Sequence, residues 1–202
     1  MPRVILITGF VAFSTHEENI SEQIVEILST TCIPGVQIET SILSVDEAGS
    51  KETSERLYRG EKFDAILHLG LSEQAENIRL ERFAKNRFEM QTPDNSGRQI
   101  ADGAIILGSQ PIVETLMPLA LIDEILDEFE EVRLSEDAGG FICNETYYRT
   151  LKAAIESSSP PVLFIHLPSG HSVPMHIQLE VVSRICKRLS QLQNEYDSGF
   201  ST

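Results

Sequence analysis

Three runs of mostly apolar residues constrain the fold of this 202-residue chain more than any other feature. Residues 4–8 (VILIT), 63–69 (FDAILHL) and 162–167 (VLFIHL) each have the length of a strand and consist largely of aliphatic side chains. Strands of this composition are typical of parallel sheets that are buried on both faces by helices. Because helical patterns lie between the runs, the sequence predicts an α/β protein.

The segments around these runs support that prediction. Amphipathic helical spacing occurs in residues 19–28, 116–129, 144–155 and 175–193, and a polar surface helix is expected at 46–60. Further strands are expected at residues 36–45, 77–84 and 132–134, and a loop at 9–14. We therefore expect one domain over residues 1–202, a three-layer α/β/α sandwich with a mainly parallel, twisted central sheet. Residues 194–202 are polar and are expected to form a flexible tail.

Composition excludes several kinds of partner. The formal net charge of −15 would repel nucleic-acid phosphates, and no stretch approaches the roughly 20 apolar residues of a spanning helix. Three irregularly spaced cysteines do not suggest a disulfide framework, and the N-terminal apolar run is too short for a signal peptide. His171 and His176 lack a metal-site spacing, so neither a metal nor another cofactor is expected. A cytoplasmic protein without nucleic-acid or membrane partners fits these observations.

Cys143 has the sequence context of a nucleophile. Gly139 and Gly140 permit a tight or left-handed backbone just before it, and a helical pattern begins just after it. The unpaired N–H groups of a helix N-terminus favour an anionic thiolate over a thiol. A buried structural cysteine is the commoner alternative, but the position between glycines and a helix start favours a functional role.

A cysteine nucleophile needs a base, usually histidine, and the base needs an orienting carboxylate or amide. His166 ends an apolar run and is the best candidate for the base, with His68 as a weaker alternative. Glu81 could orient the base, although a solvated carboxylate at a strand edge is an equally good interpretation. The residues alone thus suggest a Cys–His–acid hydrolase, without showing that these side chains converge.

Four short motifs occur in order along the chain. They are residues 8–13 (TGFVAF) with 19–21 (NIS), residues 80–86 (LERFAKN) with 93–95 (PDN), residues 138–144 (AGGFICN) and residues 164–168 (FIHLP). Each is weak alone. Together they resemble the TGFxPFGGExxNPS, ERxAxN…PDN, AGTFxCN and FIHxP motifs of pyroglutamyl peptidase I, also called pyrrolidone-carboxylate peptidase, a family of cysteine peptidases.

The resemblance implies a reaction and a catalytic triad. Cys143 would be the nucleophile, His166 the general base and then acid, and Glu81 the group that holds the imidazole. The substrate would be a peptide with an N-terminal pyroglutamyl residue, which the enzyme would release through a thioester acyl-enzyme. No cofactor is implied. Family members are often dimers or tetramers, so a homo-oligomer is expected as well.

The resemblance also implies a substrate pocket. Phe10, Phe13 and Phe141 match residues that pack on the lactam ring, which suits an uncharged, flat substrate. Ordinary core packing is the alternative for these phenylalanines. Backbone N–H groups around Cys143 are natural oxyanion donors, and Gln91 stands where the family commonly has an arginine that is thought to help the oxyanion site.

Several residues depart from the family pattern. Ala12 replaces a proline, Ser14 and Thr15 replace two glycines, and residues 71–74 (LSEQ) replace a smaller glycine-rich turn. These departures leave two alternatives open. One is a catalytically weak or silent relative that acts as a binding protein. The other is a cysteine hydrolase of a different small acyl or lactam substrate.

Overall fold

The computed structural model describes residues 2–13, 18–157 and 160–199, with side chains described as far as Gln191. Ser14 and Thr15, expected in the first loop, lie outside this part. The strands are β1 (Arg3–Phe10), β2 (Val36–Leu43), β3 (Ala65–Leu71), β4 (Ile78–Glu81), β5 (Phe83–Lys85), β6 (Ile112–Glu114), β7 (Val132–Ser135) and β8 (Val162–Leu167). The helices are α1 (Ile20–Ser29), α2 (Glu47–Tyr58), α3 (Leu119–Glu128), α4 (Ile142–Glu156) and α5 (Met175–Gly199).

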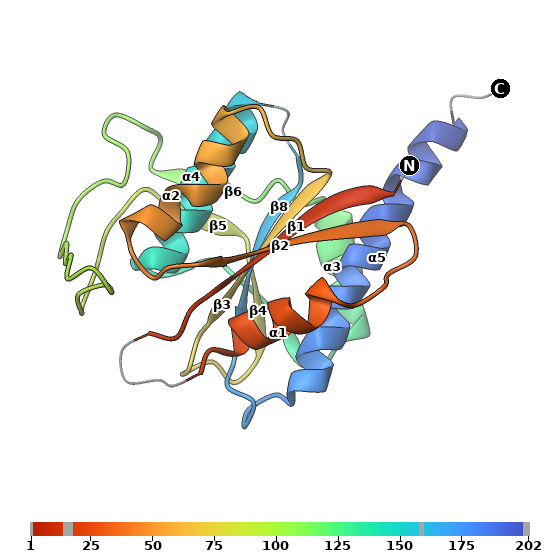
Figure 1. Ribbon diagram of the computed structural model, residues 1–202, viewed down its shortest axis with the longest axis horizontal. Helices are drawn as coiled ribbons and strands as arrows, with labels where there is room; N and C mark the ends of the chain where they lie inside the picture. Colours follow the sequence, from red (N-terminus) through yellow and green to blue (C-terminus); the bar gives the residue numbers. More distant parts are fainter. Residues whose placement is uncertain (1, 14–17, 158–159, 200–202) are drawn as a thin grey trace.

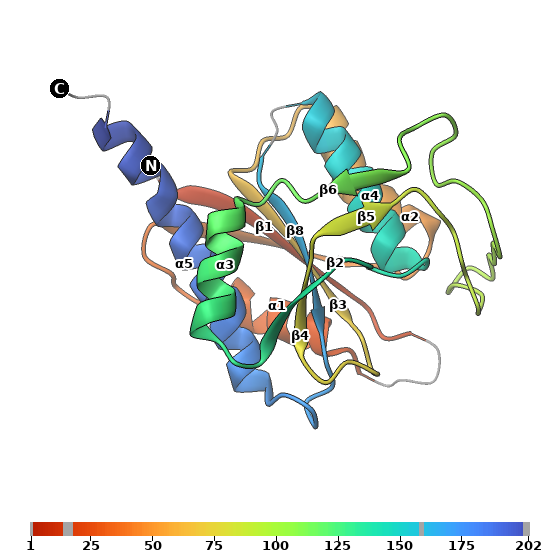
Figure 2. The same ribbon diagram turned by 180° about the vertical axis from the view of Figure 1, so that it is seen from behind.

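A six-stranded sheet forms the middle layer, in the order β2-β1-β3-β8-β4-β7. All neighbouring strands are parallel except β4 and β8, which pair antiparallel. Helices α1, α3 and α5 cover one face, and α2 and α4 cover the other (Figures 1 and 2). This arrangement confirms the expected α/β/α sandwich with a mainly parallel sheet.

The two faces of the sheet build two cores, because successive side chains of a strand point to opposite sides. In β8, Leu163 and Ile165 join the core beneath α1, α3 and α5. Phe164 joins the opposite core, where the fully buried Tyr147 and Tyr148 of α4 pack. Burial on both faces explains why the central strands have continuous apolar sequences.

Side-chain caps set the starts of α1 and α2. The Asn19 carboxamide oxygen accepts the Ser21 N–H at 3.0 Å, and the Asp46 carboxylate accepts the Gly49 N–H at 2.9 Å. Each bond satisfies a donor that the helix itself leaves unpaired, so both helices begin where the sequence pattern predicted.

Some boundaries differ from the prediction for identifiable reasons. The segment 77–84, expected as one strand, divides at Arg82 into β4, which joins the main sheet, and β5, which pairs with β6 in a separate ribbon. The Arg82 backbone N–H donates to the Ser135 carbonyl, and the Arg82 carbonyl accepts the Thr115 N–H. Arg82 therefore links both sheets. The three-residue strand β6 was not predicted.

Three further differences concern strand and helix ends. Gly9 and Phe10, expected in a loop, extend β1. Helix α3 starts at Leu119 with Pro118 as its N-cap, later than the expected start. Helix α5 extends to Gly199, where the sequence predicted a flexible tail from residue 194. Within the described residues, no helix has the length and apolar character needed to cross a membrane.

Candidate active site

The loop before α4 places Cys143 in the first turn of that helix. Gly139 has a φ of 84°, a left-handed conformation that suits glycine. Gly140 allows a close approach, since a Cβ there would lie 2.4 Å from the Cβ of Glu89, whose N–H binds the Gly140 carbonyl at 2.8 Å. The N-cap residue, Phe141, makes no side-chain capping bond within the described structure. The first N–H groups of α4, including that of Cys143, are therefore available to an anion.

Asn144 anchors this helix start from the other side. Its carboxamide accepts the Lys85 N–H at 2.9 Å and donates to the carbonyls of Lys85 at 2.8 Å and Arg87 at 3.2 Å. Asn144 is fully buried, and these three bonds satisfy both ends of its carboxamide. They attach the end of β5 to the residue next to Cys143.

Gly70, near the end of β3, leaves space for the thiol. A Cβ at this position would lie 2.8 Å from the Phe164 ring and 3.1 Å from the Cys143 sulfur. Gly70 pairs with His166 across β3 and β8, so the thiol lies beside the strand position that carries the histidine.

The antiparallel pairing of β4 with β8 brings Glu81 to His166. Glu81 lies opposite Phe164, two residues before His166 on the same face of β8. Side chains in such diagonal positions are within reach of each other. The His166 Nδ1 atom and a Glu81 carboxylate oxygen are 2.8 Å apart, and the Glu81 side chain is fully buried.

Cys143 lies near the His166 ring, and Cys143 and Glu81 together shift the pKa of His166. Burial disfavours the charged imidazolium, but the hydrogen bonds and charges of Cys143 and Glu81 outweigh it and raise the pKa of His166 to about 9. The imidazolium is consequently the favoured form at neutral pH. The second carboxylate oxygen of Glu81 has no hydrogen-bond partner within the described structure. The bond to the His166 imidazole is therefore the contact that orients the Glu81 carboxylate.

His68 has a different environment. Its ring nitrogens contact the hydroxyls of Thr8 at 2.7 Å and Thr150 at 3.0 Å, and its side chain is fully buried. Burial lowers the pKa of His68 to about 3, so it is neutral. With both nitrogens engaged, His68 joins β1, β3 and α4 and has no nitrogen left for a thiol.

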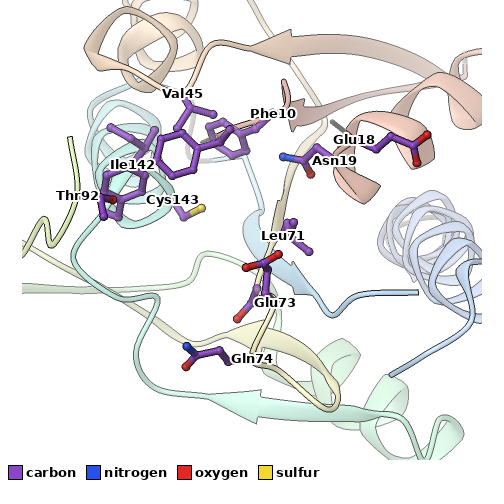
Figure 3. A pocket seen from close by; sticks show the side chains of 13 residues that line it. Phe10, Glu18, Asn19, Val45, Leu71, Glu73, Gln74, Thr92, Ile142 and Cys143 are labelled. Carbon is purple, nitrogen blue, oxygen red and sulfur yellow. The ribbon is translucent and has the colours of Figure 1, made fainter. Parts of the chain in front are cut away.

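A cavity of about 440 Å³ opens beside Cys143 (Figure 3). Its lining comes from the ends of β1, β2 and β3 and from the start of α4, as expected for sites at the carboxyl edge of parallel strands. The lining residues are Phe10, Phe13, Glu18, Asn19, Val45, Leu71, Ser72, Glu73, Gln74, Thr92, Phe141, Ile142 and Cys143. Within the described chain, no group of three or more His, Cys, Asp or Glu residues could hold a metal ion.

All three phenylalanines singled out in the sequence line this cavity, with different degrees of burial. Phe13 and Phe141 are half-buried, and their ring centroids are 5.1 Å apart. Phe10 is only 3% exposed, and its ring centroid lies 6.4 Å from that of Phe164. Gln91 is exposed and does not line the cavity; its backbone carbonyl accepts a hydrogen bond from the Gln99 side chain.

Other parts of the lining were not singled out as site residues. Val45 and Thr92 occupy the wall opposite Leu71 and Gln74 in Figure 3. Thr92 directly precedes the PDN motif, which was the available signal for it. Residues 71–74 were noted as a departure from the family, and all four line the cavity.

Comparisons with known proteins show the family. A family model described as pyroglutamyl peptidase matches residues 3–183. The chain belongs to the pyroglutamyl peptidase family. Among its relatives is the pyrrolidone-carboxylate peptidase of Pyrococcus furiosus, 30% identical over 166 residues, or 81% of this chain and 80% of that protein. The Staphylococcus aureus protein of the same name is 31% identical over 172 residues, which cover 81% of this chain and 78% of that protein.

Solved structures of the family share the fold. The crystal structure of the pyrrolidone carboxyl peptidase from Fervidobacterium islandicum matches with a TM-score of 0.84 and 31% sequence identity. The match covers 94% of this chain and 99% of that one. Since nearly the whole length of that peptidase is matched, the fold described above is that of the family.

Proposed function

We propose that this chain is a cysteine exopeptidase that removes N-terminal pyroglutamate from peptides, with Cys143, His166 and Glu81 as its triad. The observation that carries this function is the convergence of three side chains. The buried Glu81 carboxylate holds the Nδ1 atom of His166 at 2.8 Å, and the Cys143 thiol, at a helix N-terminus, lies against Gly70, the strand neighbour of His166. This is the arrangement that activates a thiol as a nucleophile.

Acylation uses each of these groups. The Cys143 thiolate attacks the pyroglutamyl carbonyl carbon, and the carbonyl oxygen becomes an oxyanion stabilised by backbone N–H groups of the first turn of α4. The C–N bond then breaks, and the His166 imidazolium gives its Nε2 proton to the leaving amine. A thioester and a peptide with a free amino terminus result. Gln91 lies outside the cavity and would have to move to assist the oxyanion.

Deacylation returns the site to its starting state. A water molecule attacks the thioester carbonyl while His166, now neutral, accepts its proton. The C–S bond breaks, and pyroglutamate leaves with the Cys143 thiolate and the imidazolium restored. Glu81 keeps the imidazole oriented in both steps and stabilises its charged form.

The cavity suits a pyroglutamyl group. The lactam is flat and uncharged, and the half-buried rings of Phe13 and Phe141 present apolar faces beside Cys143. Aromatic faces bury such a ring with little loss of conformational freedom in the protein.

Turnover of pyroglutamyl-coumarin amide, measured beside alanyl and prolyl analogues, tests the function. A pyroglutamyl peptidase cleaves the first substrate and spares the other two. A silent relative would cleave none of them, and a hydrolase of another acyl group would prefer one of the analogues.

Phe10 and Phe13 should respond differently to truncation. Phe13→Ala removes a half-buried apolar contact, so the KM for the pyroglutamyl substrate should rise roughly 10- to 100-fold while the melting temperature changes little. Phe10→Ala removes a core side chain and should lower the free energy of unfolding by about 3–5 kcal/mol. Kinetics and melting measured on the same samples check this; an early-melting Phe13→Ala with an unchanged KM would remove Phe13 from the pocket.

The raised pKa of His166 sets the alkaline limit of activity. Imidazolium is present below its pKa and is lost above it, so kcat/KM should fall as pH rises through about 9. Glu81→Gln removes a charge that raises this pKa, so the alkaline limb should shift to lower pH. An alkaline limb that stays in place in Glu81→Gln would contradict the role of Glu81.

We further propose a homo-oligomer, a dimer or tetramer, in a reducing compartment such as the cytoplasm. All three cysteines are unpaired, which suits an enzyme that needs a free thiol.

A further inference from the structure

Two buried carboxylates and two half-buried arginines form a set of charges close to the nucleophile in the chain. Glu145 follows Cys143 by two residues, and its side chain is fully buried. Arg98 donates to both of its carboxylate oxygens, at 2.6 and 3.3 Å. Arg149, one turn along α4, donates twice to one of them, at 2.8 and 3.0 Å. Arg98 also donates to Asp94 at 2.9 Å.

Asp94 folds the segment that carries Arg98. One of its carboxylate oxygens accepts the backbone N–H groups of Ser96 and Arg98, each at 2.9 Å, and the Ser96 hydroxyl at 2.7 Å. The other accepts the Arg98 guanidinium, and the Asp94 side chain is fully buried. The turn at residues 94–98 is thus held in one shape, and Arg98 extends from it to α4.

This segment forms part of the cavity wall. Thr92 lines the cavity, and so does Val45, whose carbonyl accepts the Asn95 N–H at 2.9 Å. Earlier in the connection between β5 and β6, the Glu89 backbone N–H donates to the Gly140 carbonyl. The wall is therefore attached to Val45, which follows β2, to Gly140, which precedes α4, and through Arg98 to Glu145 of α4.

Such an attachment is needed because the connection is long. Residues 86–111 join β5 to β6 without a helix or a strand of the main sheet. Loops of this length are usually functional, and their conformation has to be specified by particular contacts. Buried ion pairs add little net stability, yet they permit few alternative geometries because an unpaired buried charge is strongly unfavourable.

We propose that Arg98 is a positioning residue, which holds the Thr92 wall at the distance from Phe141 and Cys143 that fits the lactam ring. It acts through Glu145 and does not touch the substrate. The role rests on the proposed function, because the width of the pocket matters only for the group that occupies it.

Arg149 provides a matched control. Both arginines bind the Glu145 carboxylate, but Arg149 lies on α4 itself, so its ion pair does not reach the loop. Arg98→Met should raise the KM for pyroglutamyl-coumarin amide roughly tenfold or more, with kcat changing much less. Arg149→Met should leave KM within about twofold. Arg98→Lys should restore KM only in part, because an ammonium lacks the planar fork of donors.

A second measurement does not depend on turnover. Amide hydrogen exchange of residues 92–98 should accelerate in Arg98→Met and stay near wild type in Arg149→Met. Equal KM and equal exchange in the two variants would overturn the role of Arg98. A lowered melting temperature of Arg98→Met without a change in KM or in exchange would overturn it as well.

If Arg98→Met does not fold, Asp94→Asn weakens the same attachment and takes its place. A wild-type protein that cleaves no pyroglutamyl substrate would refute the proposed function instead, and the exchange contrast would still show whether Arg98 holds the wall.

Discussion

Cys143→Ala is expected to lose hydrolysis of pyroglutamyl substrates by roughly 10⁴-fold or more, because no other group in the cavity can form the thioester. The substitution removes one half-buried sulfur atom, so the variant should fold normally. Steady-state turnover and a thermal melt of the same preparation test both statements.

The other two cysteines serve as controls. Cys32 is exposed, and Cys186 is buried in the core beneath α5, where burial raises its pKa to about 12. Cys32→Ala should retain full activity. Iodoacetamide should label Cys143 before Cys32 and leave Cys186 unmodified. A Cys143 that resists alkylation, together with an active Cys143→Ala, would show that the nucleophile lies elsewhere.

His166→Ala is expected to lower kcat by about 10³- to 10⁶-fold, since the thiolate then lacks its imidazolium partner and the leaving amine lacks a proton donor. The exposed His171 gives a control: His171→Ala should behave as wild type. Because His68 is bound by Thr8 and Thr150, it should not replace the missing base. Wild-type activity in His166→Ala would refute the triad and make His68 the next candidate.

The placement of Gln91 bears on how the oxyanion is stabilised. Gln91 stands outside the cavity, whereas Ile142 and Cys143, in the first turn of α4, line it. A site that depends on backbone donors needs that turn to be held firmly. The contacts of Asn144 with Lys85 and Arg87, and of Glu145 with Arg98, hold it from two sides.

The sequence alone determined those features that depend on neighbouring residues. Apolar runs marked β1, β3 and β8, and helical patterns from residues 19 and 46 marked α1 and α2, because these signals act within a few residues. The two glycines before Cys143 predicted its place at the start of α4. Four motifs in order indicated the family that the comparisons later showed.

The tertiary structure decided which distant residues meet. Glu81 and His166 are 85 residues apart, and they converge because β4 runs antiparallel to β8 in a sheet that is otherwise parallel. The alternating pattern of residues 77–84 gave no sign of strand direction or of the division at Arg82. Arg98 and Glu145 are 47 residues apart, and no local pattern links them. Periodicity and propensity report how a segment folds, whereas strand order and register, set by packing of the whole chain, determine which segments share a site.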